Sequence, residues 1–215
     1  NTERSVIALD VGGTSVKSGL VGPDRSVTDE RRVPVDHRAG RSAVVARFEE
    51  ASAVDRRSGV SRVAIAFPGP FDYRRGVSLM VHKFASISGV ALADELPGRL
   101  KRPDLDIRFV HDAAAAGAGE VCVLPDTAGT TLVLTLGTGM GAALFEAGVL
   151  VEHRAGYEIS ELWCEPAHTA GRGATRSADD VFSATGLARR LNVEAAQLPQ
   201  AIAEPSAEAE LATWG

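Results

Sequence analysis

Cysteine, long apolar runs and aromatic residues are all scarce in this chain of 215 residues. Cys122 and Cys164 are the two cysteines, too few and too far apart for a disulfide framework or a zinc knuckle. No apolar run is long enough to span a bilayer, and the first residues lack the basic and apolar regions of a signal peptide. We therefore expect a cytoplasmic protein with reduced thiols and no membrane partner.

The chain also lacks an excess of basic residues. Its formal net charge is −5 and its pI is near 5.6, so it has no electrostatic footprint for nucleic acid. Basic doublets such as Arg31-Arg32 and Arg56-Arg57 are typical of a solvated surface. Hydrophobic residues make up 45% and charged residues 24%, the balance of an ordinary globular protein that buries a core. We predict no nucleic-acid partner.

Glycine is plentiful, and two glycine-rich turns each follow an apolar strand. The first is DVGGT at residues 10–14 and the second is LGTGMG at residues 136–141. Glycine lets backbone N–H groups approach a phosphate closely, and an aspartate beside them can hold hydrated Mg²⁺. Either turn alone is also an ordinary hairpin turn, but the pair predicts two lobes that hold one polyphosphate. The candidate phosphate-binding residues are Asp10 (also Mg²⁺, through water), Gly12, Gly13, Thr14, Lys17, Gly137, Thr138 and Gly139.

Hydrophobic periodicity and turn residues predict an α/β protein whose second half echoes the first. The predicted strands cover residues 5–11, 15–21, 26–35, 62–67, 106–110, 130–136, 141–145 and 149–151. The predicted helices cover 41–57, 91–101, 112–121 and much of the chain from 178 onward, and the stretch after residue 67 is irregular. The repeated three-strand meander indicates a duplicated fold, with one lobe at residues 1–111 and another at 112–215.

Asp112 stands where a predicted strand gives way to an alanine-rich helix. Aspartate is a favoured N-cap, so a purely structural role would explain it. Phosphoryl transfer, however, needs a base directed at the attacking hydroxyl, besides positioning and charge neutralisation at the phosphates. Asp112 is therefore our candidate base, with the capping role kept open beside it.

Four motifs, in this order and spacing, resemble the ROK (repressor, ORF, kinase) family: LDVGGT at 9–14, AFPGP at 66–70, HDA at 111–113 and LGTGMG at 136–141. The resemblance implies an actin-like ATPase (ribonuclease H-like) fold with two lobes and a mixed sheet in each. It implies a homodimeric sugar kinase that transfers a phosphoryl group from ATP or polyphosphate, with Mg²⁺, to a hexose in the cleft. Asp112 would be the catalytic base, and residues 132–148 are especially similar to polyphosphate glucokinases.

The sugar-binding positions depart from the family pattern. His111 replaces a usual asparagine, Glu161 replaces a histidine, and Lys83 is the nearest counterpart of another asparagine. Lys83 either offsets the charge of the glutamates or recognises an acidic sugar. The family's zinc loop is absent, so we expect no structural zinc site. The candidate substrate-binding residues are Gly69, Lys83, His111, Asp112, Glu158, Glu161 and, by a less secure alignment, Asp179.

Three functions stay open at this point. A sugar kinase is favoured because both glycine turns and Asp112 are intact. A sugar-responsive repressor is disfavoured, because such relatives carry an N-terminal helix-turn-helix and this chain starts at the first strand. A catalytically weak or inactive sugar- or phosphate-binding relative is supported by the altered sugar positions. The chain also ends before the segment that closes the family's nucleotide site, so either the sequence is truncated or the protein is a short form with an incomplete adenine pocket. Only the short form would also support a weak or inactive relative.

Overall fold

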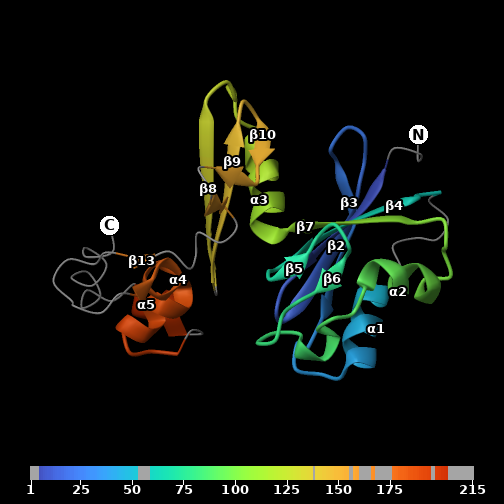
Figure 1. Cartoon of the computed structure of the whole chain (residues 1–215), viewed down its shortest axis with the longest axis horizontal. Coiled ribbons are helices and arrows are strands. Elements are labelled where there is room, and N and C mark those ends of the chain that lie inside the picture. Colours follow the sequence, from blue (N-terminus) through green and yellow to red (C-terminus); the bar gives the residue numbers. More distant parts are fainter. Residues whose placement is uncertain are drawn as a thin grey trace. The chain divides into compact units, whose positions relative to one another are not determined.

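The computed structural model describes residues 5–52, 59–137, 139–154, 157–159, 166–167, 176–194 and 197–202. The chain divides into two compact units, unit 1 (Asn1–Ala115) and unit 2 (Ala116–Gly215). Helix α3 (Asp112–Val121) runs across the division, and each unit has a sheet of its own (Figure 1). Among the described residues, no helix has both the length and the apolar character that crossing a bilayer requires.

Unit 1 is built on a five-stranded sheet whose strands, in spatial order, are β3 (Val27–Pro34), β2 (Ser15–Val21), β1 (Val6–Val11), β4 (Arg62–Phe67) and β7 (Asp106–His111). The first three strands form an antiparallel meander, and β4 and β7 run parallel to β1. The register places Asp10 beside Ala66, and Phe67 beside His111. The carboxyl ends of β1, β4 and β7 therefore meet at one edge, where Asp10 and Asp112 were predicted to act.

The core of unit 1 lies between this sheet and two helices, α1 (Arg41–Ser52) and α2 (Leu92–Arg99). Alternate residues of β1 are buried, as a strand with one covered face requires. Helix α1 buries Val44, Val45 and Phe48, whose spacing forms one helical stripe. Figure 1 shows α1 and α2 next to each other, and their residues contact one another. Burial of a side chain such as Phe48 contributes about 1.5–3 kcal/mol.

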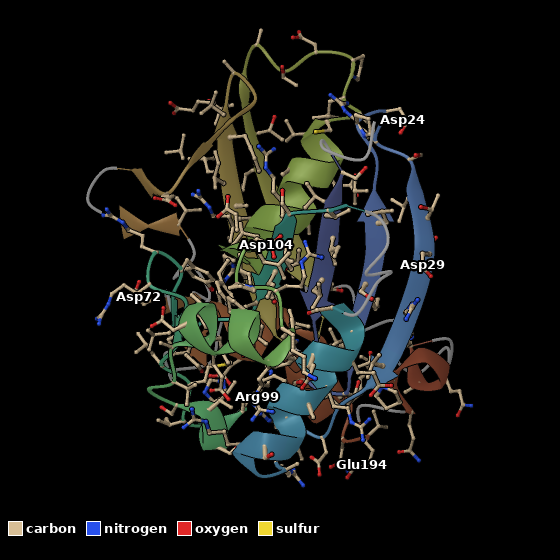
Figure 2. The ribbon with its side chains drawn as sticks, turned by 90° about the vertical axis from the view of Figure 1, so that its right-hand side faces the viewer. Asp24, Asp29, Asp72, Arg99, Asp104 and Glu194 are labelled. Carbon is tan, nitrogen blue, oxygen red and sulfur yellow. The ribbon has the colours of Figure 1, made fainter. Side chains whose placement is uncertain are left out.

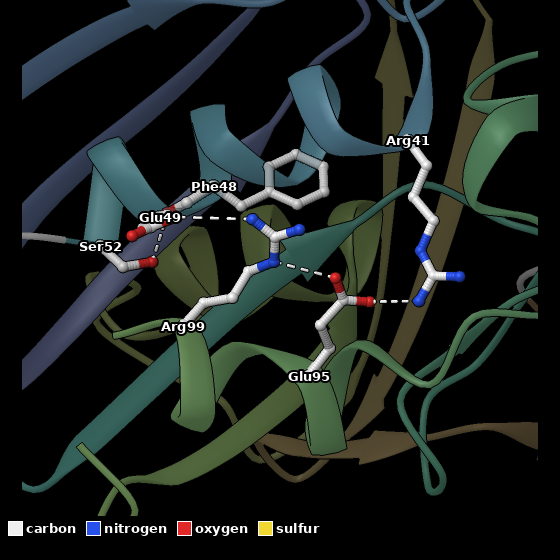
Figure 3. Close-up of polar contacts among 6 residues, drawn as sticks. All are labelled: Arg41, Phe48, Glu49, Ser52, Glu95 and Arg99. Atoms are coloured by element: carbon white, nitrogen blue, oxygen red, sulfur yellow. Dashed lines mark hydrogen bonds and ion pairs between the residues drawn. The ribbon is translucent and has the colours of Figure 1, made fainter. Parts of the chain in front are cut away.

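An ion-pair network joins α1 to α2 (Figure 3). Glu95 accepts a hydrogen bond from Arg41 Nη2 at 2.6 Å and another from Arg99 Nε at 2.9 Å. Arg99 also lies 3.8 Å from Glu49 of α1. The two guanidinium groups hold the pKa of the Glu95 carboxyl below its ordinary value, and the hydrogen bond from Arg41 has the larger effect. This network links the two helices, whose apolar side chains share the core of unit 1.

Figure 2 labels several acidic side chains of unit 1, and two of them, Asp24 and Asp104, bond to neighbours close in the sequence. Asp24 accepts a hydrogen bond from the Ser26 hydroxyl at 2.6 Å, and Asp104 accepts one from Arg102 Nη2 at 2.8 Å. These bonds lower the pKa of both carboxyls. The two carboxylates therefore form only local hydrogen bonds within their own loops, as is typical of a solvated surface.

The stretch after residue 67 contains more structure than its irregular sequence predicts. It forms the short pair β5 (Phe71–Asp72) and β6 (Val77–Ser78) and the 3₁₀ turn η2 (Ala85–Ile87). Phe71, Met80 and Phe84 of this stretch are buried in the core of unit 1. Strands of two residues are too short to show a period, so the sequence pattern could not predict them.

Unit 2 begins with a three-stranded antiparallel sheet of β8 (Thr130–Leu136), β9 (Met140–Glu146) and β10 (Val149–Val151). Helix α3 packs closely on one face of it. A Cβ atom at Gly117 would lie 2.7 Å from the Phe145 ring and 3.2 Å from Ala143 Cβ, so glycine is what permits this approach.

The rest of unit 2 consists of short elements. Two small ladders pair β11 (His153–Arg154) with β12 (Tyr157–Glu158), and β13 (Pro166–Ala167) with β14 (Arg176–Ser177). Three helices follow: α4 (Ala178–Phe182), α5 (Ala184–Arg190) and α6 (Leu198–Ala201). The hydroxyls of Ser177 and Ser183 cap α4 and α5.

The long predicted elements are confirmed within one or two residues in most cases. The helix predicted over residues 41–57 is described as far as Ser52, and residues 53–58 lie outside the described part. The predicted three-strand echo is present as β1–β2–β3 and β8–β9–β10. The helical character predicted from residue 178 onward is confirmed through α6.

Candidate phosphate and sugar site

The first glycine turn joins β1 to β2 and closes on itself. The N–H of Gly12 donates to the Ser15 carbonyl at 2.9 Å, and a Cβ on Gly12 would lie only 3.2 Å from that oxygen. Asp10 and Lys17 face each other across the two strands, and their charged groups are 3.2 Å apart on an exposed surface. The turn therefore presents one carboxylate and one ammonium group beside its backbone.

The loop after β3 holds this turn from outside. Val35 N–H donates to the Thr14 carbonyl, and His37 Nδ1 lies within hydrogen-bond distance of the Gly13 carbonyl, both at 3.0 Å. Within the described segments, no group accepts a hydrogen bond from the backbone N–H of Gly13 or Thr14. Two amides of the turn are thus available for an anion. His37 was not among the predicted site residues, since a lone histidine in a loop belongs to no motif.

His111 ends β7 in a largely enclosed position. Its side chain is 16% exposed, its ring stands edge-on to Tyr73, and its Nδ1 lies 3.5 Å from Asp112 Oδ1. Gly69 lies against Tyr73 and His111, because a Cβ at Gly69 would be 3.6 Å from the Tyr73 hydroxyl and 3.7 Å from the His111 ring. The structure therefore brings together Gly69, His111 and Asp112, three of the predicted substrate residues. Tyr73, which the sequence did not indicate, donates to the Phe67 carbonyl at 3.1 Å and braces the His111 ring.

Asp112 is the first residue of α3 and its side chain is 42% exposed. One oxygen, Oδ1, accepts a hydrogen bond from the adjacent Ala113 N–H at 2.7 Å. Among the described residues, none donates a hydrogen bond to the other oxygen. Asp112 thus supports the start of the helix with one oxygen and keeps the second for another partner.

Lys83 precedes the buried Phe84 in the loop before η2. The Phe84 N–H donates to the His37 carbonyl at 3.1 Å, and the Leu79 N–H of the same loop donates to the Pro70 carbonyl at 3.2 Å. The Lys83 loop is therefore tied both to the loop that holds the first turn and to the neighbour of Gly69. No carboxylate pairs with Lys83 in the described part of the chain.

The second glycine turn joins β8 to β9 and is held by α4 and α5. The N–H of Gly137 donates to the Gly139 carbonyl at 2.9 Å, and the Ala184 N–H donates to the Gly137 carbonyl at 2.8 Å. Asp179 Oδ1 accepts the Met140 N–H at 2.6 Å. Asp179, which was predicted to bind the sugar, therefore uses at least one carboxylate oxygen to hold this turn. Its neighbour Asp180 bonds to Ser177 and Arg189, which lowers the pKa of that carboxyl.

The sequence of this chain is similar to those of known proteins. Residues 6–197 match the sequence profile of the ROK family. The chain belongs to the ROK family. It is 29% identical over 191 residues to a glucokinase of Thermotoga maritima, a match that covers 86% of this chain and 59% of that protein. It is 26% identical over 188 residues to an N-acetylmannosamine kinase of Escherichia coli O157:H7, covering 86% of this chain and 63% of that one.

A solved structure supports the same membership. The inorganic polyphosphate/ATP-glucomannokinase of Arthrobacter sp. strain KM superposes with a TM-score of 0.67 and 26% identity, over 94% of this chain and 78% of that one. This similarity confirms the predicted actin-like ATPase fold. The chain spans about three fifths of the length of the two kinases above.

Some predicted residues of this ROK chain cannot be compared with the structure. Thr138 and Glu161 lie outside the described residues. Glu158 belongs to β12, but its side chain is likewise outside the description. Within the described residues, no cluster of three or more histidine, cysteine, aspartate or glutamate side chains could hold a metal ion.

Proposed function

We propose that this ROK-family chain contributes the phosphate- and sugar-binding parts of a sugar kinase. The phosphoryl group would pass from ATP or polyphosphate to a hydroxyl of a hexose or hexose-like sugar. The observation that carries the proposal is the edge of the unit 1 sheet. There a glycine turn with two backbone amides follows β1, and Asp112 follows β7. The two amides and one Asp112 oxygen have no hydrogen-bond partner among the described residues.

The roles follow from the chemistry of phosphoryl transfer. The N–H groups of Gly13 and Thr14 would bind phosphate oxygens, and Lys17 would offset their charge. Asp112 would accept the proton of the attacking hydroxyl on its uncommitted oxygen while Oδ1 stays bonded to Ala113. The new bond joins the sugar oxygen to phosphorus as the bond to the donor's leaving oxygen breaks.

Asp10 is the residue that fits a magnesium ion. Mg²⁺ is usually held by one or two carboxylates together with substrate phosphates and water, and Asp10 offers an exposed carboxylate beside the turn. When bound, Mg²⁺ would neutralise charge on the phosphates. If Asp10 bound Mg²⁺ instead of Lys17, the Lys17 ammonium group would also become free to bind the donor.

Sugar selection would rest on His111 and Lys83. An imidazole offers a sugar hydroxyl one donor and one acceptor, whereas asparagine offers both kinds on a single amide. Lys83 adds a positive charge that favours an acidic sugar or a sugar phosphate over a neutral hexose. The named relatives are a glucokinase and an N-acetylmannosamine kinase, which support sugars as the substrate class.

The decisive experiment measures phosphoryl transfer from ATP and from inorganic polyphosphate, with Mg²⁺, to neutral, amino and acidic sugars. Turnover with one sugar would support the proposal and identify donor and acceptor together. Binding of a donor without transfer to any sugar would favour a catalytically inactive binding relative. The homodimer that we also propose is tested by light scattering on the same sample.

A further inference from the structure

His37 makes contacts that reach from its own loop to two other parts of unit 1. Its Nδ1 lies 3.0 Å from the Gly13 carbonyl oxygen in the first glycine turn. Its backbone carbonyl accepts the Phe84 N–H at 3.1 Å, and its ring stands edge-on to Phe84 with 6.1 Å between centroids. One residue thus joins the turn to the segment that carries Lys83.

The contact with Gly13 fixes a direction as well as a distance. Because a carbonyl oxygen can only accept, His37 Nδ1 must carry the proton. The Gly13–Thr14 peptide is planar and trans, so its C=O and N–H point in opposite directions. Holding the carbonyl toward His37 therefore turns the Thr14 N–H away from it. That N–H is one of the two amides without a partner among the described residues.

The other side of His37 rests on a rigid support. Phe84 is fully buried, with its ring centroid 6.0 Å from that of Phe48 and 5.8 Å from that of Phe67. Its φ of 51° lies in the left-handed region, which a phenylalanine adopts only when its surroundings hold it there. His37 therefore links the buried aromatic side chains to the first glycine turn.

We propose that His37 is a positioning residue for the phosphoryl donor. Through the Gly13 carbonyl it directs the Thr14 N–H at a phosphate oxygen, and through Phe84 it keeps the turn in register with Lys83. This inference rests on the proposed function, because it takes the first turn to bind phosphate. It adds a residue that neither glycine turn contains.

The test compares three variants of the full chain. His37→Leu removes the Nδ1–H donor while it keeps an apolar side chain against Phe84. His37→Asn keeps an N–H donor near the position of Nδ1. Ser86→Ala is the matched control, because Ser86 donates to the Ala39 carbonyl at 2.7 Å and so links the same two segments without contact to the turn.

Equilibrium binding of ATP with Mg²⁺, and separately of inorganic polyphosphate, is measured by calorimetry for all proteins. We expect His37→Leu to raise both dissociation constants about tenfold, a typical effect of losing one oriented hydrogen bond. His37→Asn should recover binding to within about threefold of the unmodified chain, and Ser86→Ala should not change it. The KM for the sugar should change less than twofold in His37→Leu, because this variant weakens only the binding of the phosphoryl donor.

Three results would overturn the role of His37: unchanged donor binding in His37→Leu, equal loss in His37→Asn, or equal loss in Ser86→Ala. If the unmodified chain binds donor but phosphorylates no sugar, the kinase proposal fails while the binding series still decides on His37. If the unmodified chain binds neither probe, both proposals fail.

Discussion

Strands β1 and β8 each lead into a glycine turn, but their apolar side chains lie in different surroundings. Ile7, Leu9 and Val11 of β1 are 2–5% exposed, whereas three leucines of β8 are 45–52% exposed, namely Leu132, Leu134 and Leu136. In unit 1, β4 pairs with the second edge of β1, and α1 and α2 contribute to the same core. In unit 2, no described strand pairs with the second edge of β8. An alternating strand thus specifies which residues share a face, and the neighbouring elements decide whether that face is buried.

The two turns are also held differently. The first is held by Val35 and His37, which follow it by about twenty residues in the same unit. The second is held by Asp179 and Ala184, which bond to turn residues 39 and 47 positions earlier in the sequence. The first is held by two N–H groups of a neighbouring loop, and the second by a carboxylate and a backbone N–H.

The largest effect is expected when the carboxylate at the start of α3 is removed. Asp112→Asn should lower kcat on the order of 10³-fold, because an amide cannot accept the hydroxyl proton. The KM for the donor should stay within about twofold, since Asp112 does not touch the first turn. Steady-state kinetics with the sugar found in the substrate panel measure both constants.

The fold should survive this change, which is checked by thermal unfolding of Asp112→Asn and Asp112→Ala. Asp112→Ala should lose about 1 kcal/mol from the missing bond to Ala113 N–H. Wild-type turnover in either variant would show that Asp112 serves only to cap the helix.

The next effect concerns the two apolar strands. Leu9→Ala should lower the free energy of unfolding by about 3 kcal/mol, because it leaves a cavity in a closed core. Leu134→Ala should cost less than about 1 kcal/mol, because its side chain is already half exposed. Urea unfolding followed by circular dichroism compares the two. Equal losses would mean that the face of β8 is covered in solution.

A smaller effect is expected at the second turn. Asp179→Ala leaves the Met140 N–H without its acceptor and should weaken donor binding about tenfold. Asp179→Asn retains an acceptor oxygen and should bind donor within about twofold of the unmodified chain. Calorimetric titration with ATP and Mg²⁺ provides the measurement. If Asp179→Asn instead raises only the KM for the sugar, Asp179 acts as the sugar ligand that the alignment implied.

The smallest effect concerns pH and the helices of unit 1. The lowered pKa of Glu95 means that its bonds to Arg41 and Arg99 stabilise the fold above about pH 4.5 and are lost as pH falls through the lowered value. Glu95→Gln should therefore cost about 0.5–1 kcal/mol at pH 7 and very little in strong acid. Unfolding at several pH values measures the difference.

Glu50→Gln serves as the control for Glu95. Glu50 pairs with Arg47 on an exposed face of α1 and should contribute almost nothing at any pH. An equal pH dependence in the two variants would contradict the structural role of the Glu95 network.

Most of the long elements could be predicted because their sequences carry a clear period or a clear stop. The glycine turns were predictable as well, since glycine follows an apolar strand in both. The short strands at Phe71 and Val77 were not, because two residues show no period. Tyr73 and His37 were missed for a related reason, since their partners are fixed by folding and neither residue belongs to a motif.

The sequence by itself determined the ROK family, the repeated meander and the residue types of both turns, because these depend on local spacing. Only the tertiary structure decided which carbonyls and carboxylates are already occupied. Asp112 and Asp179 are both aspartates near a helix start, yet one bonds to the next residue and the other to a turn 39 positions away. A hydrogen bond depends on where two chain segments meet, and spacing along the chain does not record that position.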